Sequence, residues 1–241
     1  MLRRIGRFLL CLLTGFFIWS FLLVILYRDL PPPITPLMLL RLAEGNGLDK
    51  SWEPLDRISP ALVRAAMAGE DSKFCLHDGF DWGAMRTAWK DYRRGRLVLG
   101  ASTISMQSAK NLFLWPGRNW WRKGLEAYFT ALMELSMSKR RIMEIYLNIV
   151  EWAPGVYGAE AAARHHFHRS AAALTSQQAA LLAAVLPNPQ RWSASRPSGY
   201  ILGRASVIHA RMPDVPGANP PPCGWPEKRP PVWDGLWPAS H

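Results

Sequence analysis

Cysteine is scarce in this chain of 241 residues, and its three cysteines, Cys11, Cys75 and Cys223, follow no motif spacing. This argues against a disulfide-rich scaffold. Cys11 lies inside a hydrophobic run, so at most one disulfide, between Cys75 and Cys223, is possible. The sequence alone gives no reason to predict that this bond forms.

Acidic residues are also few: 18 Asp and Glu stand against 29 Lys and Arg, which leaves a formal net charge of +11. Such a balance favours an anionic partner, which could be nucleic acid, anionic lipid or a phosphate-bearing substrate. Zinc-ligand spacing and RNA-binding signatures are missing, so no nucleic-acid partner is expected. The tract from His165 to His168 lacks an i,i+4 histidine pair with an intervening Glu, which disfavours a metal site there.

Alternating strand patterns are missing too, and helix signals take their place. We therefore expect an all-α domain over about residues 59–212. Polar residues that can cap a helix mark several starts: Ser59 before Pro60, Ser102-Thr103, Ser138 and a capping box from Thr175 to Gln178. Further helices are expected from Gly155 to His166 and from Ser198 to Met212.

Residues 8–27 form one long run without a charge. About 20 helical residues at ~1.5 Å each span about 30 Å, the hydrocarbon thickness of a bilayer. A cleaved signal peptide would have a shorter apolar core and a small-residue cleavage site, whereas this run ends in Tyr27-Arg28-Asp29. Arg3, Arg4 and Arg7 precede the run. The positive-inside rule then predicts a single-pass protein of the cytoplasmic (inner) membrane, with the N-terminus inside and the rest on the periplasmic side.

The chain divides into four segments by composition. They are residues 1–28, the cytoplasmic tip and transmembrane helix; 29–58, a Pro-rich connector and membrane-proximal segment; 59–212, the helical domain; and 213–241, a tail rich in Pro and Trp. In the connector, Met38 to Leu42 could form a short apolar helix at the lipid surface or under the domain. The tail is expected to be extended, and either mobile or docked through its tryptophans.

The most informative stretch runs from Gly69 to Asp81. Glu70 and Asp71 follow an Ala-rich helical segment, and Phe74, His77 and Gly79 indicate a compact turn. Glu70 would therefore sit at the end of a rigid element, aimed at a substrate. The structural alternative, a charged helix end, is disfavoured because acidic residues oppose the helix dipole at the C-terminus.

Other clusters carry charge or hydrogen-bonding groups. Ser102 and the start of the next helix could bind an anion, with Gln107 and Lys110 on one face. Arg118, Arg122 and Lys123 gather near Glu126 and a Trp-Trp pair, which suits a lipid-linked phosphate. The structural alternatives are a capped helix with a solvated Lys and an ordinary exposed Arg122–Glu126 pair.

Together and in this order, these clusters resemble the family 51 glycosyltransferases, the peptidoglycan polymerases. Glu-Asp-x-x-Phe-x-x-His-x-Gly of that family is matched from Glu70 to Gly79. The other matching stretches are Gly100 to Asn111, Arg122 to Glu126, Lys139 to Asn148 and Arg204 to Ile208. The short length and lone anchor resemble the monofunctional biosynthetic transglycosylases rather than the bifunctional penicillin-binding proteins. In this chain, Ser105 and Met106 replace a Thr and the first Gln of the family pattern, while Gln107 retains the second.

The resemblance implies a lysozyme-like glycosyltransferase domain that polymerises lipid II into β-1,4 glycan strands, with inversion and release of undecaprenyl diphosphate, in cell wall biogenesis. It implies that Glu70 is the general base and Glu126 a second catalytic residue. It assigns substrate binding to Ser102, Gln107, Lys110, Arg118, Arg122, Lys123 and Asn148. A divalent metal, Mg or Mn, could assist the leaving diphosphate. The expected partners are lipid II, the growing strand, the membrane and other wall-synthesis proteins.

Two rival interpretations stay open from the sequence. A lytic enzyme of lysozyme-like fold would cleave glycan by acid catalysis at Glu70, but it would need no diphosphate site. A non-catalytic scaffold would bind wall-synthesis proteins through the anchor and the tail, and it would show no turnover.

Overall fold

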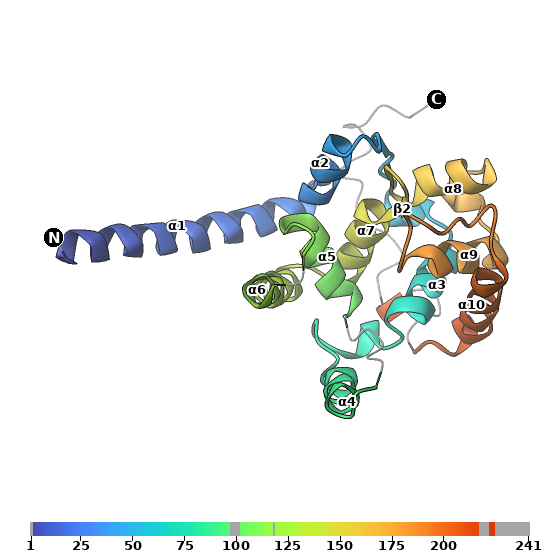
Figure 1. The fold of residues 1–241 in the computed structure, drawn as a ribbon. Helices are drawn as coiled ribbons and strands as arrows, with labels where there is room; N and C mark the ends of the chain where they lie inside the picture. The colour runs from blue at the N-terminus through green and yellow to red at the C-terminus, as the bar shows by residue number, and fades with distance from the viewer. Residues whose placement is uncertain (1, 97–101, 118, 217–221, 225–241) are drawn as a thin grey trace.

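A long helix, α1 (Leu2–Asp29), projects from a body of shorter helices (Figure 1). The computed structural model describes residues 2–96, 102–117, 119–216 and 222–224. Within these ranges the body contains α2 (Pro36–Ala43), α3 (Pro60–Glu70), α4 (Trp82–Arg93), α5 (Ile104–Phe113), α6 (Trp120–Ser136), α7 (Lys139–Ile149), α8 (Ala159–Phe167), α9 (Ser176–Val185) and α10 (Gly199–Arg211). The predicted all-α class is confirmed.

The predicted capping residues form the expected bonds. Ser59, Thr103, Ser138 and Ser198 each accept a backbone N–H in the first turn of α3, α5, α7 and α10. At the start of α9, Thr175 and Gln178 make both bonds of a capping box. These bonds satisfy N–H groups that a helix start would leave unpaired.

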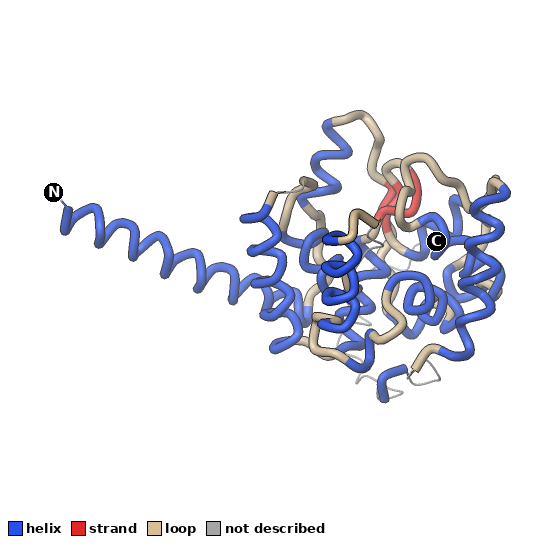
Figure 2. Tube along the Cα trace, turned by 60° about the horizontal axis from the view of Figure 1, so that its bottom comes forward, coloured by secondary structure: helices blue, strands red, loops and turns tan. Residues whose placement is uncertain are grey.

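A small three-stranded sheet was not predicted (Figure 2). Its order is β1-β3-β2, with β1 (Asp49–Lys50) parallel and β2 (Glu151–Ala153) antiparallel to β3 (Val156–Tyr157). The helix predicted from Gly155 to His166 is wrong at its start, since α8 begins at Ala159. Gly155 instead turns the chain between β2 and β3 at φ +71°, and a Cβ there would lie 2.0 Å from the carbonyl oxygen of Asn46.

Helix α7 lies at the centre of the body. Its residues from Arg140 to Ile149 are all buried, including the charged Arg140, Arg141 and Glu144. Buried charges are costly unless paired, and here Arg140 meets Asp56 at 2.7 Å while Arg141 pairs with Glu144. Helices α5 and α6 pack on the anchor side of α7, and α3, α9 and α10 form a second group on the other side (Figure 1).

Helix α1 is long and apolar enough to cross a membrane. Its segment Arg3–Asp29 has 27 residues, which at about 1.5 Å each extend about 40 Å. Buried Arg141 holds its C-terminal end, because the guanidinium donates to the carbonyl of Tyr27 at 3.0 and 3.1 Å and to that of Leu30 at 2.6 Å. The end of α1 is therefore tied to the central helix of the body.

Both alternatives for the connector are partly realised in α2. Met38 is fully buried under the body, whereas Leu39, Leu40 and Leu42 stay exposed. Most of the predicted tail, including its tryptophans, lies outside the described residues. One described part of it, Cys223, forms a disulfide with Cys75.

Candidate active site

Glu70 is the last residue of α3, a helix that buries its alanine-rich face and ends at the turn before Phe74. Its side chain is 13% exposed. Gln107 of α5 donates from Nε2 to one carboxylate oxygen at 2.9 Å, and Arg204 of α10 approaches the other at 3.4 Å. The carboxylate is therefore held from two sides by helices distant in sequence.

Burial raises the pKa of the Glu70 carboxyl above its ordinary value, because the charged form loses its hydration. The hydrogen bond from Gln107 and the charges of Arg204 and Lys110 oppose that rise, and Asp71 adds to it. A carboxylate with a raised pKa is a stronger base than an exposed one.

Asp71 has a structural role beside Glu70. Its carboxylate accepts the backbone N–H of Ile104 at 3.0 Å, at the start of α5, and lies 3.1 Å from Nε2 of His77. An acidic group at a helix N-terminus is favoured by the helix dipole. Asp71 thus fixes the position of α5, and with it the position of Gln107.

Gly79 lets the turn after Glu70 pack closely against α6. Its φ of +88° suits glycine, and a Cβ there would lie 2.8 Å from Cγ2 of Thr130. The Gly79 carbonyl also accepts from the hydroxyl of Thr103 at 2.6 Å, next to the start of α5. The predicted compact turn is confirmed, and it joins α5 and α6 to the end of α3.

Lys110 links Glu70 to a second charged group. It lies one turn after Gln107 on α5, and burial lowers the pKa of its amine. Glu126 and Glu70 both raise that pKa by their charges, whereas the cations Arg122 and Lys123 lower it. Lys110 is therefore within electrostatic reach of both glutamates.

A cation cluster surrounds Glu126 on α6. The glutamate is buried, accepts from Arg122 at 2.9 Å and also pairs with Lys123. Burial of the Arg122–Glu126 pair rules out the ordinary exposed pair considered from the sequence. Lys110, Arg122 and Lys123 are three cations around the single carboxylate of Glu126. The cluster therefore has a net positive charge that can attract an anion.

Several buried polar atoms around this site have no hydrogen-bond partner within the described part of the chain. They include Nε of Arg122, Nε of Arg204 and the hydroxyl of Tyr146. Burial raises the pKa of Tyr146, and the charges of Glu70 and Asp71 raise it further, which places its ring near them. Buried polar groups are rarely left unsatisfied, so these atoms indicate where water or a ligand binds.

The remaining predicted site residues differ in their surroundings. Ser102 is half-buried and precedes the cap Thr103. Asn148 is fully buried, and its amide bonds the backbone of Glu53 and Glu144, all at 2.8 Å, so these contacts hold the connector and give no support to substrate binding. Arg118 lies outside the described residues.

Two residues near Glu70 were not among the predicted site residues. Arg204 approaches Glu70 across 134 positions of sequence, which its spacing to Ile208 could not reveal. Tyr146 lies within the stretch Lys139 to Asn148 that matches the family pattern, and it was given no role there. Met106, which replaces the family's first Gln, is buried, whereas Gln107 beside it reaches Glu70.

A base and an anion site therefore lie within electrostatic reach of each other. The base can take a proton from a hydroxyl, and the cation cluster can stabilise negative charge that develops on a leaving group. Lys110 connects the two, and displacement of a phosphate-type leaving group by a hydroxyl is the chemistry that fits both.

Comparison with known proteins agrees with this chemistry. The family model described as Transglycosylase matches residues 39–213. A biosynthetic peptidoglycan transglycosylase of Rhodospirillum centenum is 54% identical over 213 residues, 88% of this chain and 92% of the relative. Relatives of the same name from Caulobacter vibrioides and Pseudomonas putida are each 51% identical, covering 84% and 91% of this chain and 92% and 94% of their own lengths.

Proposed function

The chain belongs to the transglycosylase family, and from this premise we infer that Glu70 is the general base of a peptidoglycan glycosyltransferase. The enzyme polymerises glycan chains in cell-wall synthesis. The single observation that carries the site assignment is the bridge on α5. Gln107 bonds Glu70, and Lys110, three residues later, is within electrostatic reach of both Glu70 and Glu126.

Glu70 acts in its ionised form. The acceptor sugar hydroxyl is a poor nucleophile, and a carboxylate within about 3 Å of it removes the proton as the new glycosidic bond forms. Gln107 and Arg204 orient the carboxylate. One displacement at the anomeric carbon gives inversion, because no covalent sugar–enzyme intermediate intervenes.

The leaving group departs toward the cation cluster. As the bond to the anomeric carbon breaks, charge develops on the diphosphate oxygens, and Lys110, Arg122 and Lys123 stabilise it. Glu126 holds Arg122 and Lys123 in position through its two oxygens. Glu126 is therefore proposed as a positioning residue for these cations.

The proposed substrate is lipid II, a disaccharide-peptide on undecaprenyl diphosphate, and the growing glycan strand is its partner. The proposed location is the inner membrane, with the N-terminus in the cytoplasm and the catalytic domain on the periplasmic side. Arg3, Arg4 and Arg7 before the apolar run support this orientation. The Cys75–Cys223 disulfide supports it too, since such bonds persist in oxidising compartments.

A divalent cation, Mg or Mn, stays a separate proposal. The described residues include no group of three or more His, Cys, Asp or Glu that could hold one. The oxygens of Glu126 already contact Arg122 and Lys123. These donors do not fit a metal held by protein ligands alone, so no step here depends on one. Rates measured after chelation with EDTA, and again after adding Mg or Mn, test the dependence.

Turnover of purified lipid II by the full-length protein in detergent tests the function. Glu70→Gln should lower the rate by about 100-fold or more, the usual contribution of a general base, while the fold is retained. Glu44→Gln, at the exposed end of α2, is the matched control and should keep wild-type activity. Near-normal turnover by Glu70→Gln would refute the base assignment.

The same preparation separates the rival functions. Finished peptidoglycan should not be cleaved, because the cation cluster has no task in hydrolysis. Release of soluble fragments would instead favour the lytic enzyme, and absence of any turnover by the wild type would favour the scaffold.

A further inference from the structure

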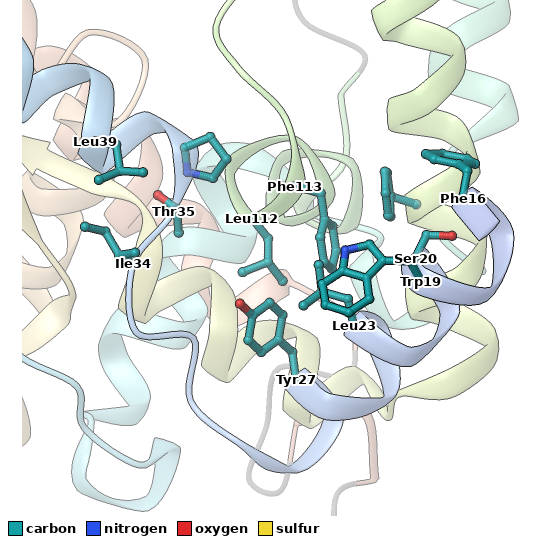
Figure 3. Close-up of a pocket in the computed structure, with 12 residues that line it drawn as sticks. Phe16, Trp19, Ser20, Leu23, Tyr27, Ile34, Thr35, Leu39, Leu112 and Phe113 are labelled. Carbon is teal, nitrogen blue, oxygen red and sulfur yellow. The ribbon is translucent and has the colours of Figure 1, made fainter. Parts of the chain in front are cut away.

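A pocket of about 370 Å³ lies between the anchor helix and the catalytic body (Figure 3). Trp19, Leu23 and Tyr27 of α1 are spaced four residues apart and so share one face, and they border the pocket opposite Leu112 and Phe113 of α5. Its volume is within the range of about 300–1,000 Å³ that is typical of ligand pockets.

The lining is mostly apolar, and two of its polar groups, those of Ser20 and Thr35, are already bonded within the protein. Ser20 donates to the carbonyl of Phe17 at 3.0 Å and shares a 2.6 Å hydrogen bond with the hydroxyl of Tyr128. The hydroxyl oxygen of Thr35 accepts the backbone N–H of Met38. A sugar or a phosphate would find little to bond here, whereas a hydrocarbon chain would lose nothing on entry.

The pocket adjoins the cation cluster through two helices. Phe113 lies three residues after Lys110 on α5, and Phe129, which also lines the pocket, lies three residues after Glu126 on α6. Three residues advance a helix by about 4.5 Å, and residues three apart lie on the same side. The two rings stack with centroids 4.4 Å apart. One turn therefore separates the proposed diphosphate site from the pocket wall.

Part of the pocket wall belongs to the apolar helix that is long enough to cross a membrane. From Phe16 to Tyr27, the lining of α1 covers 11 residue steps, about 17 Å of helix, which is roughly one leaflet. Trp19 at the wall is 68% exposed and Leu39 of α2 is 53% exposed. These exposed apolar side chains would offer a lipid chain an apolar surface beside the pocket.

We propose that this pocket binds the first part of the polyprenyl chain of the lipid-linked substrate, next to its diphosphate. The proposal rests on the proposed function for the identity of the lipid. It commits to the substrate's own chain because the pocket continues the cation cluster, to which a phospholipid acyl chain has no comparable link. The anchor helix thereby forms part of the substrate site.

Filling the pocket tests the proposal. Leu23→Trp narrows it, and Leu22→Trp is the matched control, because Leu22 is the next residue of α1, is 54% exposed and does not line the pocket. Each full-length variant is assayed with a disaccharide diphosphate that carries a long polyprenyl chain and with an analogue that carries a very short one.

Leu23→Trp should raise KM for the long-chain substrate by about tenfold, the effect of losing roughly two buried methylene contacts. Its kcat and its KM for the short-chain analogue should stay near wild type, and Leu22→Trp should change neither. An unchanged KM ratio between the two substrates in Leu23→Trp, whether through no effect or through equal loss, overturns the proposal. Failure of the wild type on both substrates would instead count against the proposed function.

A second measurement needs no catalysis. A polyprenyl diphosphate with a diazirine near the diphosphate is photolysed with the wild-type protein in detergent, and the labelled peptides are mapped. Labelling around Leu23 and Leu112 that unlabelled polyprenyl diphosphate removes, and equimolar phosphatidylglycerol does not, supports the proposal. Equal competition by phosphatidylglycerol, or labelling confined to the opposite face of α1, contradicts it.

Discussion

The pKa of the Glu70 carboxyl depends on two opposing effects, burial and the groups around it. Burial raises its pKa, while Gln107, Arg204 and Lys110 lower it. In the proposed mechanism the working form of Glu70 is ionised, so we expect activity to rise with pH through this pKa. Removing a neighbouring cation raises the pKa and moves the acid limb of the rate profile to higher pH.

Arg204→Gln tests that balance. The acid limb of kcat/KM should move upward by on the order of one pH unit, since an adjacent cation stabilises the carboxylate. Arg211→Gln, at the exposed end of the same helix, is the control and should leave the profile in place. An unchanged acid limb in Arg204→Gln would show that Arg204 does not act on Glu70.

We expect Lys110 to set the alkaline limb of the rate profile. Burial lowers the pKa of its amine below the usual value of about 10.4, and the amine must be protonated to stabilise the leaving diphosphate. Activity should therefore fall as pH rises through this lowered pKa. Lys110→Arg keeps its charge in alkali, so its alkaline limb should move to higher pH, whereas Lys110→Met should lose most activity at every pH. A wild-type alkaline limb in Lys110→Arg would assign that limb to another group.

At the scale of elements, the turn after α3 decides how the catalytic helices meet. Gly79→Ala places a methyl group against Thr130 at a positive φ, so it should destabilise the protein. Gly95→Ala is a matched control, because Gly95 has φ +66° and no atom within 4 Å of an added Cβ. Gly95→Ala should cost about 1–2 kcal/mol from its backbone alone, and Gly79→Ala about 1–3 kcal/mol more from overpacking. Thermal unfolding followed by tryptophan fluorescence measures both, and equal losses would mean that the turn relaxes.

Elements with a local signal could be predicted from the sequence. A capping residue before an apolar repeat predicted the starts of five helices, and the structure confirms them. They are α3, α5, α7, α9 and α10. The sheet could not be predicted by periodicity, because its strands have two or three residues and their order depends on long-range pairing. Two local turn signals were missed: Asn46-Gly47 just before β1, and Pro154-Gly155 between β2 and β3.

In the candidate site too, residues in contiguous motifs could be predicted, whereas contacts between distant segments could not. Glu70 and the cations near Glu126 were predicted because their motifs are contiguous, and the structure brings Glu70, Gln107 and Lys110 together. The contact of Arg204 with Glu70 spans α3 and α10, so only the packing of these helices reveals it. The catalytic and binding roles themselves stay predictions until the variants are measured.

At the scale of the whole molecule, the disulfide joins the active-site turn to the C-terminal segment. Cys75 and Cys223 are separated by 148 positions, and closing a loop of this kind typically stabilises a protein by about 2–4 kcal/mol. Cys223→Ser should lower the midpoint of thermal unfolding, and a reductant should lower it in the wild type but not in the variant. Cys11→Ser, in the anchor, should change nothing. A wild-type midpoint that is insensitive to reductant would contradict a stabilising bond.

The bonds from Arg141 to the carbonyls of Tyr27 and Leu30 hold the end of α1 directly against the body. With α1 across a membrane, these bonds would limit how far the body tilts relative to the helix. We expect that an anchor joined to the body in this way sets the direction in which a growing glycan leaves the enzyme.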